Sequence, residues 1–156
     1  MNKVMTKKDR YYKVIQAIDA FIGPEGYDMT DIGRMATISS ILASEFKEWI
    51  FTGFYRTIKP GLLEIGPYQG DVLACGTIKF GKGVCGTAAE KLETVIVDNV
   101  NEFPGYIACD GETVSEIVVP VIRNGQCIAV LDIDTGTESA FDEVDKQHLE
   151  KIVTYC

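Results

Sequence analysis

The chain contains 156 residues, a length that favours one domain with a core of its own. Its 15 Lys and Arg residues and 23 Asp and Glu residues give a net charge of −8, which argues against nucleic acid and anionic membranes as partners. The longest apolar runs, near 117–122 and 127–131, are too short to span a bilayer, and Met1–Arg10 lacks the apolar core of a signal peptide. Composition therefore predicts an acidic, cytoplasmic globular domain.

Two helices are expected at the N-terminus. Apolar residues recur at three- and four-residue intervals from Thr6 to Ile22, and Gly23-Pro24 should end this helix. A second helix should begin near Thr30 or Asp31. The residues with this spacing in the first helix are Val14, Ile15, Ile18, Phe21 and Ile22, and the predicted buried stripe of the second helix is Ile32, Met35, Ile38, Leu42 and Phe46.

The middle of the chain is expected to form strands joined by turns. An aromatic-rich strand is predicted at 49–55, with short strands at 62–65, 76–80 and 94–97. A short helix should follow Gly83. The stretch 98–115 has little periodicity, and a loop of that length inside a compact domain is usually functional or disordered; because it contains Cys109, we favour a functional loop.

The region from Glu116 to Asp134 carries the clearest pattern in the sequence. Two apolar runs flank Asn124-Gly125, which predicts a hairpin whose strands lie in the middle of a sheet. A capping-box pattern at 139–142 then opens the last helix. Helices at both ends of a mostly antiparallel sheet predict a single α+β domain, with N-terminal helices in 1–47, the sheet and loops in 48–138, and the last helix in 139–156.

The register of this hairpin decides which side chains share a face. Asp132 and Asp134 share one because side chains alternate along a strand. A two-residue turn would put Glu116 opposite Ile133, whereas a three-residue turn with Gly125 as a bulge would put it opposite Asp132. Only the three-residue turn collects three carboxylates on one face. The opposite face should then pack against the helices with Ile117, Val119, Val121, Cys127, Ala129 and Leu131.

The five cysteines do not form a metal-binding or scaffold pattern. There is no C-x-x-C pair and the only histidine is His148, expected at the surface or rim, so zinc is not predicted. An odd count in a reducing compartment also argues against a disulfide scaffold. In a strand, Cys127 should be buried, and Cys156 should be exposed. The other three, Cys75, Cys85 and Cys109, fall in loops and at a helix start, where they could be structural or reactive.

The glycine-rich segment 81–86 matches G-x-G-x-x-G after a strand. A dinucleotide-binding fold needs an N-terminal βαβ unit, and here two helices precede the motif while an antiparallel hairpin follows it. The first turn of the helix after Gly83 can instead bind a small carboxylate through free backbone N–H groups. Its dipole should also favour a thiolate at Cys85.

Several short segments between residues 66 and 134 form one recognisable pattern. They are Gly66–Gly70 with Cys75, Gly83–Ala89 with Cys85, Ile107–Asp110 with Cys109, Ser115–Pro120, and Val130–Asp134. Together they resemble the free methionine-(R)-sulfoxide reductases, which are single GAF-domain enzymes. The resemblance covers roughly residues 48–153, and the cysteine spacings of 10 and 24 residues mark this branch of GAF domains.

The resemblance implies a reaction and a set of cysteine roles. The substrate would be free methionine-(R)-sulfoxide, and thioredoxin would restore the enzyme. Cys109 matches the nucleophile on which a sulfenic acid forms, and Cys75 matches its disulfide partner. Cys85 matches a third active-site cysteine. No metal or cofactor is expected, and the family suggests a homodimer.

The resemblance also implies a substrate pocket. Three matched carboxylates would bind the substrate and supply a proton, and the residues expected at this pocket are Glu116, Asp132, Asp134, Phe51, Tyr55 and Val84. Phe51 stands where the family usually has tryptophan, and Trp49 should lie on the same strand face two residues earlier. Two other functions remain open: a GAF module that senses a small ligand, and a redox sensor that forms only the Cys75–Cys109 disulfide.

Overall fold

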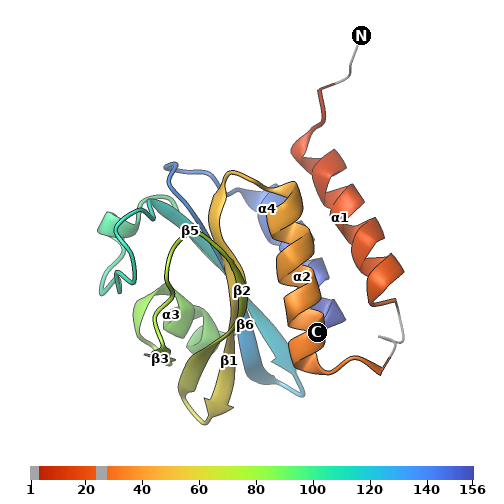
Figure 1. The fold of residues 1–156 in the computed structure, drawn as a ribbon. Helices are drawn as coiled ribbons and strands as arrows, with labels where there is room; N and C mark the ends of the chain where they lie inside the picture. Colours follow the sequence, from red (N-terminus) through yellow and green to blue (C-terminus); the bar gives the residue numbers. More distant parts are fainter. Residues whose placement is uncertain (1–3, 24–27) are drawn as a thin grey trace.

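The computed structural model describes residues 4–23 and 28–156, so the predicted helix stop at Pro24 lies outside the described residues. Its elements form one six-stranded antiparallel sheet in the order β3-β2-β1-β6-β5-β4. The elements are α1 (Lys7–Phe21), α2 (Asp31–Glu45), β1 (Trp49–Lys59), β2 (Leu62–Gly70), β3 (Thr77–Lys79), α3 (Gly83–Lys91), β4 (Val95–Val97), η2 (Val100–Glu102), β5 (Ser115–Arg123), β6 (Gln126–Thr135), α4 (Glu143–Ile152) and η3 (Val153–Tyr155). Helices α2 and α4 lie against one face of the sheet, with α1 packed on the outer side of these two helices, and α3 covers the other face (Figure 1). This confirms the predicted α+β architecture.

The larger core lies between the sheet and the helices α1, α2 and α4. The N-terminal helices start where the sequence indicates, with the Thr6 and Thr30 side chains capping their first turns. Two residues of the predicted stripes are exposed, Phe21 at 67% and Ile32 at 50%. The prediction that Ile32 is buried was wrong. Both residues lie at helix ends, in the last turn of α1 and the first turn of α2, where the apolar spacing continues but no neighbouring element packs against it.

The last helix begins three residues later than predicted. Ser139 has a φ of 52° and lies in the preceding loop, whereas Asp142 is the N-cap and forms a capping box with Asp145. The sequence contains two overlapping cap signals in this segment. The second one is used because it lets Phe141 enter the core just before the helix starts.

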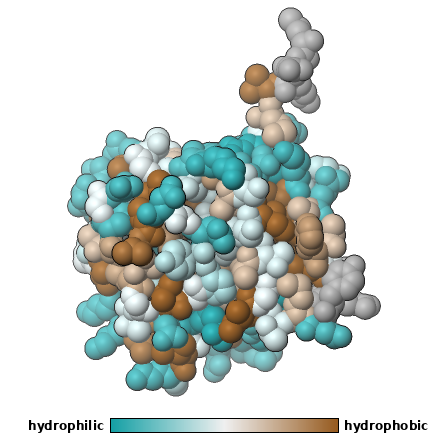
Figure 2. Space-filling view, viewed as in Figure 1, coloured by the Kyte–Doolittle hydropathy of each residue, from teal (hydrophilic) through white to brown (hydrophobic). Residues whose placement is uncertain are grey.

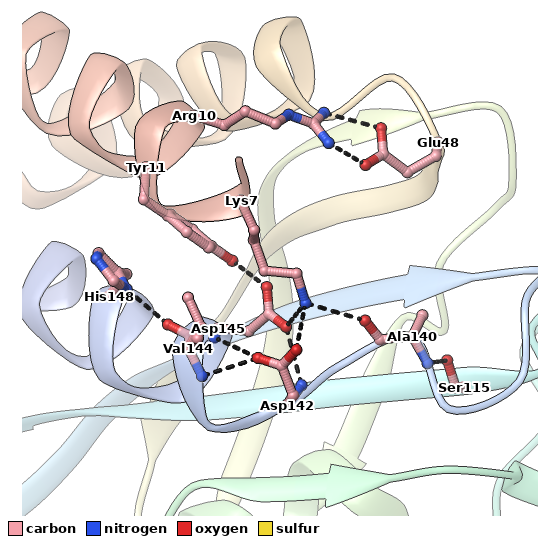
Figure 3. A network of polar contacts seen from close by, with 10 residues as sticks. All are labelled: Lys7, Arg10, Tyr11, Glu48, Ser115, Ala140, Asp142, Val144, Asp145 and His148. Atoms are coloured by element: carbon pink, nitrogen blue, oxygen red, sulfur yellow. Dashed lines mark hydrogen bonds and ion pairs between the residues drawn. The ribbon is translucent and has the colours of Figure 1, made fainter. Parts of the chain in front are cut away.

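A buried polar network fastens α1 to α4 (Figure 3). Asp145 is only 2% exposed, and its carboxylate accepts hydrogen bonds from the Tyr11 hydroxyl at 2.7 Å and from Lys7 Nζ at 2.6 Å. Lys7 also contacts Asp142 at 2.8 Å, and the half-buried His148 ring stacks on Tyr11. Because a buried carboxylate is stable only when its oxygens are satisfied, this network fixes how the N-terminal helix docks.

The β5–β6 hairpin has a different turn from the one predicted for a three-carboxylate site. Arg123 pairs with Gln126, and both Asn124 and Gly125 have positive φ angles of 52° and 74°, so the turn has two residues. The register then shifts within the ladder: Ile122 pairs with Cys127, but Val121 pairs with Ala129. The prediction of a three-residue turn was therefore wrong. The one-residue change of register comes instead from a bulge at Ile128.

This bulge sets the faces of the two central strands. Beyond it, Glu116 pairs with Asp134 and Val118 with Asp132, so the three carboxylates share the face that α3 covers. Cys127 lies before the bulge and packs on that same face, contrary to the prediction that it faces α1, α2 and α4. The remaining predicted helix-facing residues, Ile117, Val119, Val121, Ala129 and Leu131, do pack there.

A second irregularity separates two aromatic residues on β1. Trp49 pairs with Thr135 while Phe51 pairs with Asp134, so Ile50 is an extra residue on this strand. The bulge turns Trp49 toward the helices, where it stacks on Phe46 with ring centroids 4.0 Å apart. Phe51 instead belongs to the core beneath α3. The prediction that Trp49 and Phe51 share a face was wrong because strand alternation does not hold across a bulge.

No described helix is long and apolar enough to cross a membrane. On the face seen in Figure 2, hydrophobic residues lie in separate small groups between hydrophilic ones. The exposed hydrophobic side chains include Tyr12, Phe21 and Leu73, which come from different parts of the fold. Scattered exposure of this kind is usual for a folded domain.

The docking of α1 can be tested by replacing Asp145 with asparagine. The introduced amide would turn a donor toward Lys7 and toward the Asp142 backbone N–H, which donates to the native carboxylate at 2.9 Å. We expect Asp145→Asn to reduce the free energy of unfolding in urea by about 1–3 kcal/mol. Asp142→Asn is the matched control, because this side chain is 58% exposed and asparagine caps helices well. Equal losses in the two variants would contradict a buried network centred on Asp145.

Candidate active site

A small cavity lies between α3, the carboxylate face of the sheet and the loop that carries Cys109. Its volume is about 30 Å³, which suits a water molecule and is too small for an amino acid. Every predicted site residue except Cys75 lines it: Phe51, Tyr55, Val84, Cys85, Cys109, Glu116, Asp132 and Asp134. Cys75 is bonded to one of these residues, so the fold brings the whole predicted set together.

Three carboxylates from the central strands meet in this cavity. Glu116 comes from β5, and Asp132 and Asp134 come from β6; their exposures are 5%, 5% and 8%. One oxygen of each aspartate, Oδ1, has no hydrogen-bond partner among the described residues. None of the described residues that line the cavity is Lys, Arg or His. Ionisation of these carboxyl groups would therefore not be balanced by a cationic side chain among the described residues that line the cavity.

The pKa values of all three carboxyl groups are raised. Burial is the main cause in each case, because it disfavours the charged form. Repulsion from Asp132 raises the pKa values of Glu116 and Asp134 further. The pKa of Asp132 rises to about 6, since contacts with Glu116 and Cys85 partly offset its burial. The cluster thus retains protons at a pH at which exposed carboxyl groups are fully ionised. A retained proton lets one carboxyl group donate a hydrogen bond to a neighbouring carboxylate oxygen.

Cys75 and Cys109 form a disulfide at the rim of the cavity. Their Cα atoms are 5.1 Å apart, although 34 residues separate them in the sequence. The next residue, Asp110, accepts hydrogen bonds from the backbone N–H groups of Glu112 and Thr113 at 2.7 and 2.8 Å. This turn orders the loop around Cys109. Reaction at one of these sulfurs would therefore take place beside the carboxylates.

Cys85 is the third residue of α3 and is only 4% exposed. Burial raises the pKa of its thiol well above the usual range, and the charges of Asp132 and Glu116 raise it further. The expectation of a dipole-stabilised thiolate was wrong. About half a positive charge at a helix terminus is outweighed by desolvation and by neighbouring carboxylates.

The glycines of the G-x-G-x-x-G segment have local backbone roles. Gly83 has a φ of 61°, a conformation that favours glycine, at the first position of α3. A Cβ atom on Gly86 would lie 2.3 Å from the carbonyl oxygen of Lys79. The N-cap Lys82 makes no side-chain capping bond, so the first-turn N–H groups beside Val84 have no acceptor from the cap.

Two aromatic side chains, Phe51 and Tyr55, line part of the cavity. Phe51 stacks on Tyr68 and on Tyr55, with ring centroids 5.2 and 6.3 Å apart. Burial and the charge of Asp132 raise the pKa of Tyr55 and keep its hydroxyl protonated. Because Trp49 faces the other core, Phe51 provides the apolar surface at the position where tryptophan was expected.

The remaining cysteines lie away from this chemistry. Cys127 is buried as predicted, donates to the Ala129 carbonyl at 3.1 Å, and has a pKa raised to about 11 by burial. Cys156 is half-buried rather than exposed, and burial raises its pKa to about 12. Both thiols stay protonated near neutral pH.

Five cavity residues in the two loops that carry the disulfide were not predicted: Leu73, Ala74, Tyr106, Ile107 and Asp110. The available sequence signal was the aperiodic loop itself, which was predicted to be functional because it contains Cys109. Which loop residues reach the cavity depends on how the loop folds back onto the sheet, and periodicity carries no information about that.

The chain is similar to proteins of known family over most of its length. The GAF domain model matches residues 36–156. The free methionine-R-sulfoxide reductase of Escherichia coli is 34% identical over 149 residues, which cover 96% of this chain and 87% of that protein. This chain belongs to the free methionine-R-sulfoxide reductase family of GAF domains.

Two further members of this family are similar to the chain. The free methionine-R-sulfoxide reductase of Saccharomyces cerevisiae is 56% identical over 105 residues, covering 65% of this chain and 58% of the yeast protein. The match therefore spans less than two thirds of that relative. The free methionine-R-sulfoxide reductase of Neisseria meningitidis, solved in complex with its substrate, has a TM-score of 0.88 and 36% identity, covering 98% of this chain and 89% of that chain.

The uncompensated charge should make the free protein less stable as the pH rises. Glu116 has a raised pKa in the folded state, so between its unfolded value, about 4.3, and that raised value the folded protein binds more protons. Stability falls across this window. Glu116→Gln should therefore raise Tm at pH 8 by roughly 2–4 °C for each kcal/mol gained, with little difference at pH 4. Thermal unfolding at both pH values measures this.

Glu112→Gln serves as the control, because Glu112 is an exposed carboxylate in the loop just before β5, the strand that carries Glu116. It should leave Tm nearly unchanged at both pH values. If Glu116→Gln lowers Tm at pH 8 as much as at pH 4, the carboxylate is stabilised in the empty site and the account of its raised pKa is wrong.

Proposed function

We propose that this protein reduces free methionine-(R)-sulfoxide to methionine and that a dithiol protein such as thioredoxin restores it. One observation carries the proposal: three buried carboxylates without a cation line a cavity at whose rim Cys109 can bond with Cys75. The family of the chain and the names of its relatives support the same reaction.

Recognition of a free amino acid requires complementary contacts for its two charged groups. The carboxylates Glu116, Asp132 and Asp134 offer a buried site for an ammonium group, and the binding of a cation would offset their repulsion. First-turn N–H groups of α3 near Val84 suit the substrate carboxylate. A methionine inside a protein has neither charged group, so this arrangement selects the free amino acid.

The chemical step needs a nucleophile and a proton. The Cys109 sulfur attacks the sulfoxide sulfur, and a protonated carboxyl group of the cluster protonates the sulfoxide oxygen. This attack forms a transient bond between the two sulfurs. That bond and the S–O bond of the substrate then break: the hydroxyl group passes to Cys109, which becomes a sulfenic acid, and methionine leaves with the electron pair of the S–S bond. The raised pKa values of Glu116 and Asp134 support a proton donor in this cluster near neutral pH.

The second step returns Cys109 to a stable state. The Cys75 thiol attacks the sulfenic sulfur, the S–S bond forms, and the oxygen leaves as water. The 5.1 Å separation of the Cα atoms supports this pairing. A dithiol reductant then reduces the disulfide, so that one sulfoxide and two reductant thiols give methionine, water and one new disulfide in the reductant.

The carboxylates also oppose ionisation of a nearby thiol. Substrate binding reduces this opposition, because the ammonium group neutralises part of the negative charge. The nucleophile is therefore activated mainly when the substrate is present. This ordering limits oxidation of Cys109 by small oxidants in the empty site.

The substrate assignment predicts a strict epimer preference. With thioredoxin, thioredoxin reductase and NADPH, the R epimer of free methionine sulfoxide should be turned over at least about tenfold faster than the S epimer. NADPH consumption with separated epimers measures this. If neither epimer is reduced while the disulfide still forms and breaks, the protein is a redox sensor instead.

The cysteine roles predict distinct failures. Cys109→Ser should release no methionine even in a single turnover, because no nucleophile remains. Cys75→Ser should release about one methionine per chain and then recycle poorly with thioredoxin. Cys127→Ser is the control and should keep its activity. A full single turnover by Cys109→Ser would contradict the assignment.

A further inference from the structure

Cys85 shares a corner of the cavity with two carboxylates. Its Sγ atom and one oxygen each of Glu116 and Asp132 all lie within 4.8 Å of one another. The three residues are buried and come from three elements, α3, β5 and β6. The corner is therefore a built site rather than an exposed acidic cluster.

A second, independent observation points to a cationic ligand. Asp132 is 5% exposed, and its Oδ1 atom has no hydrogen-bond partner among the described residues. Asp134 has an equally unpartnered oxygen in the same cavity. With no Lys, Arg or His among the described lining residues, a bound cation would supply the missing partner.

The donor atoms select the kind of cation. A thiolate with carboxylate oxygens is a set that Zn²⁺ accepts, whereas Ca²⁺ and Mg²⁺ require six or more oxygen ligands. Bonds of about 2.0–2.3 Å would draw the three donors together by about 1 Å, which small side-chain rotations can provide. Asp134 or a water molecule can complete a tetrahedron.

The size of the cavity favours an ion over an amino acid in the disulfide form. A volume of about 30 Å³ holds one water-sized particle. Cys75 and Cys109 are bonded to each other in this form, so Cys85 is the thiol left in the cavity.

We propose that the disulfide form of this protein binds one Zn²⁺ ion through Cys85, Glu116 and Asp132. The spacing of cysteines and histidines predicted no metal site, because this site joins one cysteine to carboxylates that the β6 bulge brings to it. The ion would occupy the position proposed for the substrate ammonium, so the two would compete. Binding itself does not depend on the reductase activity.

The test is a titration of the oxidised protein with Zn²⁺ against a chromophoric chelator. Wild-type protein should bind about one ion per chain. Cys85→Ser and Asp132→Asn should each weaken this affinity at least about tenfold, as expected for loss of a ligand. Cys127→Ser is the matched control, since its thiol is buried outside the cavity lining, and it should bind like wild type. Thermal unfolding checks that each variant is folded.

Co²⁺ provides a readout that reports on the ligand directly. With wild-type protein it should give a thiolate charge-transfer absorption in the near ultraviolet, and Cys85→Ser should lack it. Undiminished binding by both Cys85→Ser and Asp132→Asn, or no binding by wild type, would overturn the proposal. Because the readout is binding, these outcomes differ from a failure of the proposed reaction, which only turnover assays detect.

Discussion

The burial of three carboxylates in one cavity, with no Lys, Arg or His among the described residues that line it, is the constraint on which the rest of this structure depends. Glu116, Asp132 and Asp134 are each more than 90% buried, and two of their oxygens lack partners among the described residues. Such a site is unfavourable when empty and favourable for a positively charged ligand. The burial and mutual repulsion of these carboxylates lower the free energy of unfolding of the empty protein. The same groups would attract the ammonium group of a free amino acid.

Two extra residues in the sheet make this arrangement possible. The bulge at Ile128 moves Glu116 into register with Asp134, and the bulge at Ile50 turns Phe51 toward the cavity while Trp49 joins the other core. Without the first bulge, a two-residue turn would point Glu116 at the helices. One extra residue on a central strand therefore decides whether the three carboxylates lie on the same face of the sheet.

Much of the fold could be predicted from local patterns. Apolar periodicity located both N-terminal helices, and two apolar runs around Asn124-Gly125 located the hairpin. The shared face of Asp132 and Asp134 followed from alternation alone. The position of the Ile128 bulge could not be predicted, because no glycine marks it and its effect, Cys127 and Ala129 on opposite faces, is visible only in the packed sheet.

The site was predicted less completely for a related reason. The pairing of Cys75 with Cys109 came from family resemblance, since a contact across 34 residues leaves no local signal. The protonated state of Cys85 depends on burial among carboxylates that come from other strands. Residues such as Tyr106 enter the cavity only after the loop has folded. Sequence patterns predict which face of a strand a residue lies on and where a helix begins or ends. The charges around a side chain depend instead on strands that meet only in the assembled fold.

The most direct test of the central claim is the proton balance of ligand binding. Calorimetry of Cys109→Ser protein with free methionine-(R)-sulfoxide at pH 7, in buffers of different ionisation enthalpy, measures the protons released on binding. If the empty cluster holds protons that an ammonium group replaces, binding should release close to one proton, and the N-acetylated sulfoxide, which lacks the ammonium group, should bind far more weakly. Equal affinity for both compounds and a heat that is independent of the buffer would contradict this account.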